Sequence, residues 1–280
     1  MDACCWWWWL LGALLLLLPP LLFMEAFGAL RFQLKIGSYC ALCLLFSALA
    51  VPVCLIRRGG RSADNMSVVR AFGRLLKYAY GVRFEVQGLE NFNVEGPYVV
   101  ISNHQSILDM MGLFEILPDR CVQIAKKELL YAGPAGLVAY LAGVVYINRK
   151  RTSDAKTIMA EVAQTMLKEN LKIWVYPEGT RNNSGDLLPF KKGAFHLAIQ
   201  AQVPIIPVVY ASYHTFYNNA RNFFTTGNVK VEVLPRIETR GLTGEDVSDL
   251  TEKCHRIMRR TFFQLSNKAE ENSGSAPTAQ

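Results

Sequence analysis

Apolar residues are distributed very unevenly along the 280-residue chain. Residues 3–24 carry no charged side chain and neither do residues 36–56, whereas charged positions recur through most of the remaining sequence. The second stretch has 21 residues, and a helix of that length rises about 30 Å, the hydrocarbon thickness of a bilayer. The pattern therefore predicts a two-helix membrane anchor over residues 1–61.

The first apolar stretch has two open interpretations. It lacks the cationic start of a secretory signal, which favours a retained segment, but small residues near its end leave cleavage open. Trp6 to Trp9 suit the aromatic belt at a membrane interface, and the arginines that follow the second stretch, Arg57, Arg58 and Arg61, suit a cytosolic flank. Whether the two helices cross the bilayer or enter one leaflet stays open.

Short β-rich runs alternate with helical patterns across residues 62–266. Strands are predicted at 82–86, 98–102, 122–125, 144–147, 173–176, 205–210 and 229–234, where β-branched or aromatic residues stand between Gly, Pro or polar positions. Helices are predicted near 64–80, 106–117, 153–170, 191–201 and 246–265. Helices between buried strands predict an α/β domain whose mixed sheet is at least partly parallel. The polar, patternless residues 267–280 predict a disordered tail.

The formal net charge of +7 narrows the class of ligand. The basic residues form short clusters among apolar runs rather than one long arm, as at Lys126-Lys127 and Lys191-Lys192. This distribution favours phosphorylated small molecules and anionic lipid head groups over nucleic acid. Cys40 and Cys43 form a CxxC within an apolar helix without nearby His or carboxylate, so no metal site is expected.

The first constellation with chemical potential is Asn103-His104 followed by Asp109, directly after a predicted strand. In one continuous helix, His104 and Asp109 would point about 140° apart. With His104 in a loop and Asp109 in the first helical turn, the carboxylate can hold one imidazole nitrogen and leave the other as a general base. The alternative is structural, because Ser106 and Asp109 also read as a helix-capping pair. No Gly-x-Ser-x-Gly elbow is present, so an external hydroxyl is the expected nucleophile.

The second constellation is Glu178-Gly179-Thr180-Arg181, again directly after a predicted strand. Ligand sites in open α/β sheets lie beyond the carboxyl ends of strands. Gly179 lets the backbone approach a ligand, and Arg181 offers a planar fork to a phosphate. Thr180 adds a hydroxyl donor, and Glu178 is placed to orient Arg181 or to accept from a glycerol hydroxyl. A surface turn with a local Glu–Arg pair is the alternative.

Together these motifs resemble those of the glycerolipid acyltransferases, a family marked by an NHx4D motif and an EGTR motif. Residues 143–149 are similar to the family's second block, with Tyr146 and Asn148 as mild departures, and residues 203–207 to its fourth block. The four blocks stand in the family's order across residues 103–207. The resemblance is to the animal 1-acylglycerol-3-phosphate acyltransferases of the endoplasmic reticulum, and it implies a catalytic domain that faces the cytosol.

The resemblance implies a role for each motif residue. His104 would take a proton from the sn-2 hydroxyl of lysophosphatidate as that oxygen attacks acyl-CoA, and Asp109 would orient the imidazole. Arg181 and its loop, with Arg149 and Lys126, would hold the acceptor's phosphate. The oxyanion donor is left unassigned, with backbone N–H groups at the start of the 106–117 helix as candidates. Acyl-CoA is then a co-substrate, no cofactor or metal is expected, and no protein partner is indicated.

One uncharged segment, residues 129–147, is long enough to be read as another membrane span. Were it to cross the bilayer, His104 and Arg181 would lie on opposite faces and could not engage one acceptor. The chemistry therefore favours a buried or membrane-dipping helix that ends in the strand before Arg149. Two alternatives to the leading function remain: an acyltransferase acting on glycerol-3-phosphate or another lysophospholipid, and a non-enzymatic membrane protein with structural motifs.

Overall fold

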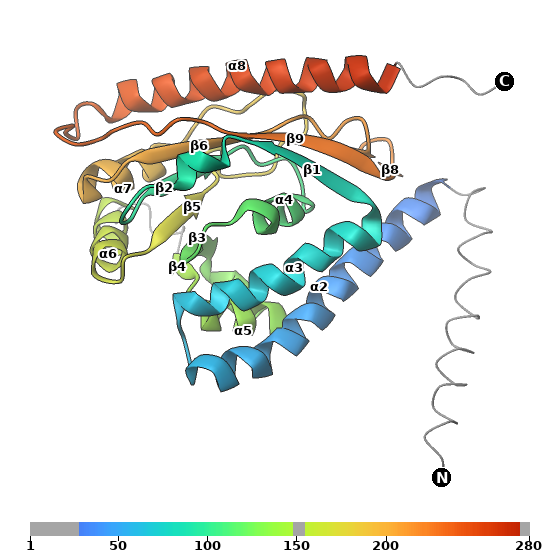
Figure 1. The fold of residues 1–280 in the computed structure, drawn as a ribbon, viewed down its shortest axis with the longest axis horizontal. Coiled ribbons are helices and arrows are strands. Elements are labelled where there is room, and N and C mark those ends of the chain that lie inside the picture. The colour runs from blue at the N-terminus through green and yellow to red at the C-terminus, as the bar shows by residue number, and fades with distance from the viewer. Residues whose placement is uncertain (1–27, 148–154, 275–280) are drawn as a thin grey trace, which may run out of the picture.

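The computed structural model of the protein describes residues 28–147 and 155–274, with a mixed seven-stranded sheet at the centre (Figure 1). The strand order is β1-β9-β6-β2-β5-β3-β4, and every neighbouring pair is parallel except β6 with β9. The strands are β1 (Val82–Gln87), β2 (Val99–Ser102), β3 (Cys121–Lys126), β4 (Val145–Ile147), β5 (Lys172–Val175), β6 (Ile205–Tyr210) and β9 (Gly227–Val233). All seven predicted strands are confirmed, and so is the mixed α/β class.

A second, two-stranded sheet was not predicted. It pairs β7 (Tyr217–Asn218) with β8 (Phe223–Phe224) in antiparallel register. Two-residue strands are too short to show alternation in the sequence, and only the tertiary packing of the rings reveals them. Phe224 stacks on Tyr80 with ring centroids 5.4 Å apart, which joins this hairpin to a distant helix.

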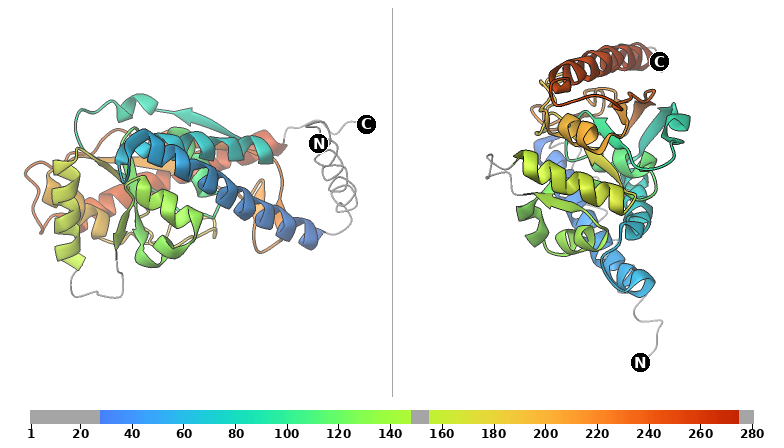
Figure 2. Two further views of the ribbon diagram at one scale, coloured as in Figure 1. Left: turned by 90° about the horizontal axis from the view of Figure 1, so that it is seen from below. Right: turned by 90° about the vertical axis from the view of Figure 1, so that its left-hand side faces the viewer.

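Helices cover both faces of the large sheet. One layer holds α2 (Gly28–Arg58), α3 (Met66–Tyr80), α4 (Asp109–Ile116) and α5 (Pro134–Leu141), and the other holds α6 (Ala155–Lys168), α7 (Gly193–Ala201) and α8 (Val247–Gly274). Figure 2 shows α8 on the opposite side of the sheet from α2. The central strands carry the core: every residue of β2 and β6 is buried, as continuous apolar runs in a covered sheet require.

Two predicted boundaries differ from the structure. The polar tail was expected from Asn267, but that residue lies inside α8, which ends at Gly274. Apolar periodicity stops near residue 266, yet the Lys, Ala and Glu residues that follow are good helix formers and prolong the helix. Similarly, the described part of α2 extends beyond the uncharged stretch 36–56 on both sides, and Lys35 within it donates to the Phe224 carbonyl at 2.8 Å.

Of the two predicted anchor helices, the structure describes the second as α2, while residues 1–27 lie outside the described part. α2 is long and apolar enough to cross a membrane, with a mean hydropathy of 2.4 and only 17% of its most apolar window buried. It is nevertheless joined to the rest of the domain. Phe32 and Tyr39 belong to the main hydrophobic core, and the Tyr39 hydroxyl donates to the Ile107 carbonyl at 3.1 Å.

The uncharged segment 129–147 contains no helix of membrane-spanning length. A 3₁₀ turn (Lys127–Tyr131), the eight-residue helix α5 and strand β4 divide it. Eight residues of helix rise only about 12 Å. β4 pairs in parallel with β3, which returns the chain to the sheet. The expected helix that ends in the strand before Arg149 is found as α5, but it is short because Gly133 and Pro134 begin it only after the 3₁₀ turn.

Candidate active site

The two predicted motifs meet at one edge of the sheet. β2 and β5 are parallel neighbours, so the loop after Ser102 and the turn after Val175 leave the sheet on the same side. Two hydrogen bonds join them directly. The His104 backbone N–H donates to Glu178 Oε1 at 2.8 Å, and the Asn182 backbone N–H donates to the His104 carbonyl at 2.8 Å. Residues 74 positions apart in sequence thus form a single site.

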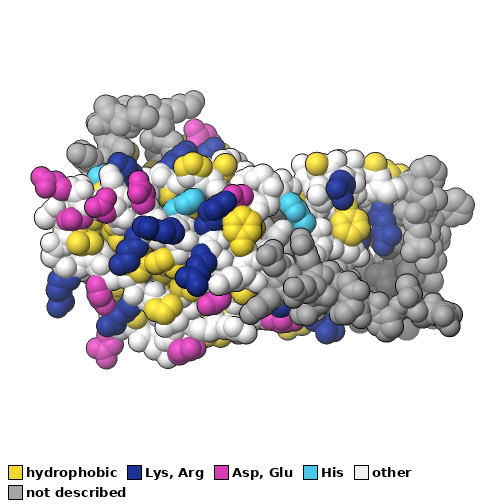
Figure 3. All heavy atoms as spheres, turned by 90° about the horizontal axis from the view of Figure 1, so that it is seen from above, with side chains coloured by type: hydrophobic (Ala, Val, Ile, Leu, Met, Phe, Trp, Pro, Cys, Tyr) yellow, Lys and Arg dark blue, Asp and Glu magenta, His cyan; other side chains and the backbone are white. Residues whose placement is uncertain are grey.

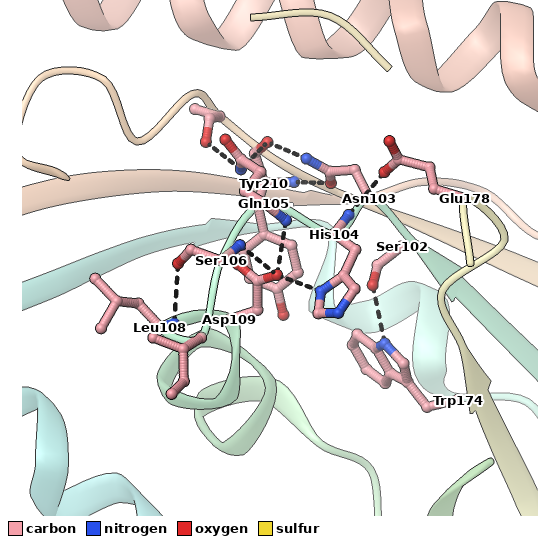
Figure 4. Close-up of polar contacts among 12 residues, drawn as sticks. Ser102, Asn103, His104, Gln105, Ser106, Leu108, Asp109, Trp174, Glu178 and Tyr210 are labelled. Atoms are coloured by element: carbon pink, nitrogen blue, oxygen red, sulfur yellow. Dashed lines mark hydrogen bonds and ion pairs between the residues drawn. The ribbon is translucent and has the colours of Figure 1, made fainter. Parts of the chain in front are cut away.

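His104 and Asp109 form the expected pair, with His104 Nδ1 2.5 Å from Asp109 Oδ2 (Figure 4). Asp109 is 1% exposed, whereas the His104 side chain is 21% exposed. A carboxylate on Nδ1 fixes the tautomer in which Nε2 lacks a proton and can accept one. The imidazole also stacks on Tyr176, with ring centroids 4.1 Å apart. The arrangement holds a general base firmly and leaves it reachable.

Asp109 also caps the loop, so the two interpretations of this residue are both correct. Its Oδ2 accepts the backbone N–H groups of Gln105 at 2.7 Å and Ser106 at 3.0 Å. The helix itself starts at Asp109, three residues later than predicted, because the Ser106 hydroxyl accepts the Leu108 N–H at 2.9 Å and forms a turn first. The carboxylate therefore fixes the loop geometry and the imidazole together.

These same hydrogen bonds bear on the candidate oxyanion donors. The N–H groups of Gln105 and Ser106 point to Asp109, and that of Leu108 points to a hydroxyl. Each is engaged in shaping the loop. Of the candidate oxyanion donors at the start of the 106–117 helix, the N–H groups of Ser106 and Leu108 are therefore engaged within the loop.

Two amide side chains, which sequence reasoning did not single out for positioning, fix the loop to the neighbouring strand β6. Asn103 donates to the Tyr210 carbonyl and accepts the Tyr210 N–H, both at 2.9 Å. Gln105 donates to the Ala211 carbonyl at 2.9 Å and accepts the Tyr213 N–H at 3.2 Å. Since both side chains are almost fully buried, these bonds are shielded from water and hold His104 at the sheet edge.

Buried phenols surround the Asp109 carboxylate. Burial, first of all, and the charge of Asp109 raise the pKa values of Tyr176, Tyr210 and Tyr213 well above their usual range, so all three stay neutral. Asp109 Oδ1 and the hydroxyls of Tyr210 and Tyr213 have no hydrogen-bond partner among the described residues. Among the described residues, His104 is the one basic side chain within ion-pair distance of Asp109.

The Glu178 carboxylate points toward the backbone of the two neighbouring loops. It is 3% exposed, and its two oxygens accept the backbone N–H groups of His104 and Leu188, the latter at 2.9 Å. Burial raises its pKa, and the two backbone donors oppose that shift. With both oxygens engaged, Glu178 orients the loops around His104, and no contact with Arg181 is made within the described structure. The sequence shows the motif but not the direction in which its carboxylate points.

Gly179 makes the turn that follows. Its φ of +71° lies in the left-handed region, and its N–H donates to the Tyr176 carbonyl at 3.0 Å. Thr180 and Arg181 are exposed beyond it, so both are available to a ligand. The positive charge of Arg181 opposes the larger effect of burial on the pKa of Tyr176, the ring that stacks on His104.

Lys126 and Arg149 complete the predicted set. Lys126 is exposed at the carboxyl end of β3, which pairs in parallel with β5 and so ends at the same sheet edge as the two motifs. Arg149 lies outside the described residues, two positions after the last residue of β4. Within residues 28–147 and 155–274, no cluster of three His, Cys, Asp or Glu side chains is placed to hold a metal ion.

The loop after the turn is fixed to helix α8. Arg259 donates to both oxygens of Asp186, at 2.7 and 2.6 Å, and His214 Nε2 lies 2.6 Å from the Asn183 carbonyl. An arginine–carboxylate fork of this kind adds geometric definition to a surface loop. The contact fastens the loop that follows Arg181 to α8.

An apolar cavity of about 230 Å³ lies between α2, α3, α4 and α5. Met110, which directly follows Asp109, is one of its lining residues. The remaining lining is almost entirely apolar or small: Cys43, Phe46, Ser47, Ala50, Met66, Val69, Phe72, Gly73, Leu76, Phe114, Gln123, Ala135, Val138, Ala139 and Val144. A cavity so lined suits a hydrocarbon chain.

Comparisons with known proteins show the family. The family model described as Acyltransferase matches residues 83–211. The chain is 56% identical over 256 residues to human 1-acyl-sn-glycerol-3-phosphate acyltransferase beta, covering 91% of this chain and 92% of that protein. It is 50% identical over 236 residues to the human alpha protein, covering 84% and 83% respectively.

Among solved structures, the 1-acyl-sn-glycerophosphate (LPA) acyltransferase PlsC from Thermotoga maritima is similar, with a TM-score of 0.65. The superposition covers 87% of this chain and 97% of that one at 20% sequence identity. At this identity the likeness concerns the fold, and it agrees with the mixed sheet and helical layers described above.

Proposed function

The chain belongs to the 1-acyl-sn-glycerol-3-phosphate acyltransferase family, and from that premise we propose that it transfers a fatty acyl group from acyl-CoA to the sn-2 hydroxyl of 1-acyl-sn-glycerol-3-phosphate. The products are phosphatidate and CoA, as in phospholipid and triacylglycerol synthesis. The observation that carries the proposal is the buried Asp109 carboxylate on Nδ1 of a reachable His104, beside the loop of Arg181.

His104 supplies the base that an alcohol nucleophile needs. Nε2 takes the proton of the sn-2 hydroxyl while that oxygen attacks the thioester carbon, and the same imidazolium can then protonate the leaving thiolate. Asp109 stabilises the imidazolium in between. A positioned base typically contributes about 10²–10⁴-fold to the rate.

The positively charged edge of the sheet supplies positioning. Arg181 beyond the Gly179 turn, and Lys126 at the end of β3, are exposed at the edge where His104 lies. A phosphate held there fixes the acceptor so that its hydroxyl stays close to Nε2, which turns an encounter in solution into an oriented reaction. Arg149 belongs to the same proposal on the strength of its motif.

The acyl chain is proposed to occupy the apolar cavity, one of whose lining residues is Met110, the residue after Asp109. Its lining comes from both the apolar helix α2 and the domain helices α3 to α5. A chain entering from a bilayer would therefore pass along the same helices that carry exposed apolar residues. Bound in this way, the hydrocarbon would stay away from water.

The same helices support a location of the protein at a membrane. Exposed large apolar residues gather on α2, α3, the 3₁₀ turn and α5: Leu30, Leu34, Leu44, Leu45, Leu49, Val53, Leu55, Ile56, Leu75, Tyr78, Leu129, Tyr131, Leu137 and Tyr140. The face that carries α8 instead shows interspersed charges of both signs (Figure 3). We place the protein in the endoplasmic reticulum membrane with its catalytic domain in the cytosol. Protease access to a C-terminal tag on intact microsomes tests the orientation.

The reaction is tested with radiolabelled oleoyl-CoA and membranes that carry either wild type or His104→Ala. Lysophosphatidate, glycerol-3-phosphate and lysophosphatidylcholine are offered separately. We expect label in phosphatidate with wild type and none with the variant. Label in another product would keep the mechanism and overturn the acceptor, and equal labelling by the variant would overturn the base.

A further inference from the structure

The side chain of Lys191 lies over the turn at Gly179, although Lys191 comes ten residues after Arg181 in the sequence. A Cβ placed on Gly179 would lie 2.7 Å from Lys191 Nζ, 2.8 Å from Cε and 2.9 Å from Cδ. The end of this side chain therefore occupies the space that a side chain at position 179 would need. The Lys191 N–H donates to the Pro177 carbonyl at 2.8 Å, so the backbone holds the lysine in this place.

The Lys191 ammonium makes no hydrogen bond or ion pair with any described residue. Its neighbour offers a contrast, because Lys192 Nζ donates to the Ser248 hydroxyl on α8 at 2.7 Å. Both lysines are exposed, and among the described residues only Lys192 is engaged by another side chain. A cation beside this turn that pairs with no described residue is available to an external anion.

Glu178, the acidic residue of the motif, does not neutralise the charge of Lys191. Both oxygens of Glu178 accept backbone N–H groups, and the side chain is 3% exposed. Arg181, two residues past the glycine, adds a second positive charge to the same turn. Two neighbouring cations without a carboxylate between them repel each other unless an anion binds.

We propose that Lys191 is a further phosphate-binding residue, which holds the phosphate of the acceptor together with Arg181. This inference rests on the proposed function. The proposal also gives a second reason, besides the positive φ, for a glycine at position 179. Any side chain there would push the Lys191 ammonium away from the turn. The acceptor carries its phosphate only a few bonds from the hydroxyl, so a grip at this turn keeps the hydroxyl near His104.

The experiment compares Lys191→Met, Lys191→Arg and the matched control Lys192→Met in full-length protein in membranes. Methionine keeps an apolar stem of similar length and removes only the charge. KM and kcat are measured for lysophosphatidate and for acyl-CoA, and then for a monoacylglycerol acceptor that lacks the phosphate. A charge-assisted hydrogen bond to phosphate corresponds to about a tenfold change or more in affinity.

We expect Lys191→Met to raise KM for lysophosphatidate about tenfold while KM for acyl-CoA and turnover of monoacylglycerol stay as in wild type. Lys191→Arg should restore most of the loss, and Lys192→Met should match wild type. A rise confined to KM for acyl-CoA would assign Lys191 to a phosphate of CoA and overturn the proposal. Unchanged constants with all substrates would overturn it as well.

The experiment tests the proposed reaction and the proposed role of Lys191 independently of each other. Wild-type activity with lysophosphatidate tests the reaction, and the variant's ratio of KM values tests Lys191. The thermal unfolding midpoint of each variant shows whether the protein folds. Should Lys191→Met unfold, the arginine and a Lys191→Gln variant give the same comparison of substrates.

Discussion

The sharpest prediction concerns Asp109→Asn, because the structure separates the two tasks of this carboxylate. Oδ2 accepts the His104 Nδ1 proton and the backbone N–H groups of Gln105 and Ser106. An asparagine carbonyl oxygen can take the same position and accept from the same donors, with its amide group where the unpartnered Oδ1 lies. The loop should therefore keep its geometry, and only the charge is removed.

The magnitude follows from the ion pair that forms when His104 takes the proton. An imidazolium and a carboxylate with charge centres about 4 Å apart attract by about 4 kcal/mol at an effective dielectric constant near 20. Loss of that attraction in the transition state lowers kcat about 10³-fold. The fold loses less, about 1–2 kcal/mol, since hydrogen bonds to a neutral acceptor replace those to a charged one.

The assay measures kcat for lysophosphatidate and the thermal unfolding midpoint of the same preparations. A fall of about three orders of magnitude in kcat with nearly native stability supports the reasoning. Activity within about tenfold of wild type would refute it, because Asp109 would then be only a helix cap. Asp109→Ala is the comparison, since it removes the cap and the charge together and should cost more stability than Asp109→Asn.

Three further predictions concern groups around the site. Glu178→Gln turns an amide N–H₂ toward a backbone N–H, so the free energy of unfolding, measured by urea denaturation, should fall by about 1–3 kcal/mol and activity should fall with it. Gly73→Ala would place a Cβ 2.1 Å from the Phe114 ring, so the core would be overpacked. The free energy of unfolding, measured by calorimetry, should fall by about 1–3 kcal/mol. The hydrogen bond from Arg259 lowers the pKa of Asp186, so this pair stabilises the protein above the usual carboxyl pKa and loses that effect as the pH falls through the lowered value. Asp186→Asn should lower the unfolding midpoint at pH 7, and wild type and variant should converge in acid.

The local sequence pattern was sufficient to predict the strands and the two motifs of this protein. The strands follow from short β-branched runs such as residues 205–210, which any buried strand of a covered sheet requires. The two motifs follow from residue chemistry at strand ends, and the parallel order of β2 and β5 brings them together as expected. These features depend on neighbours in sequence or on a rule of topology, so the sequence by itself determined them.

The tertiary structure alone decided the features that depend on distant partners. The sequence contains Glu178, but only the fold turns its oxygens toward His104 and Leu188 instead of a ligand. It contains two adjacent lysines, but only the path of the chain lays Lys191 across Gly179 and ties Lys192 to α8. Side-chain direction is set by packing between segments far apart in sequence, and no local pattern encodes it.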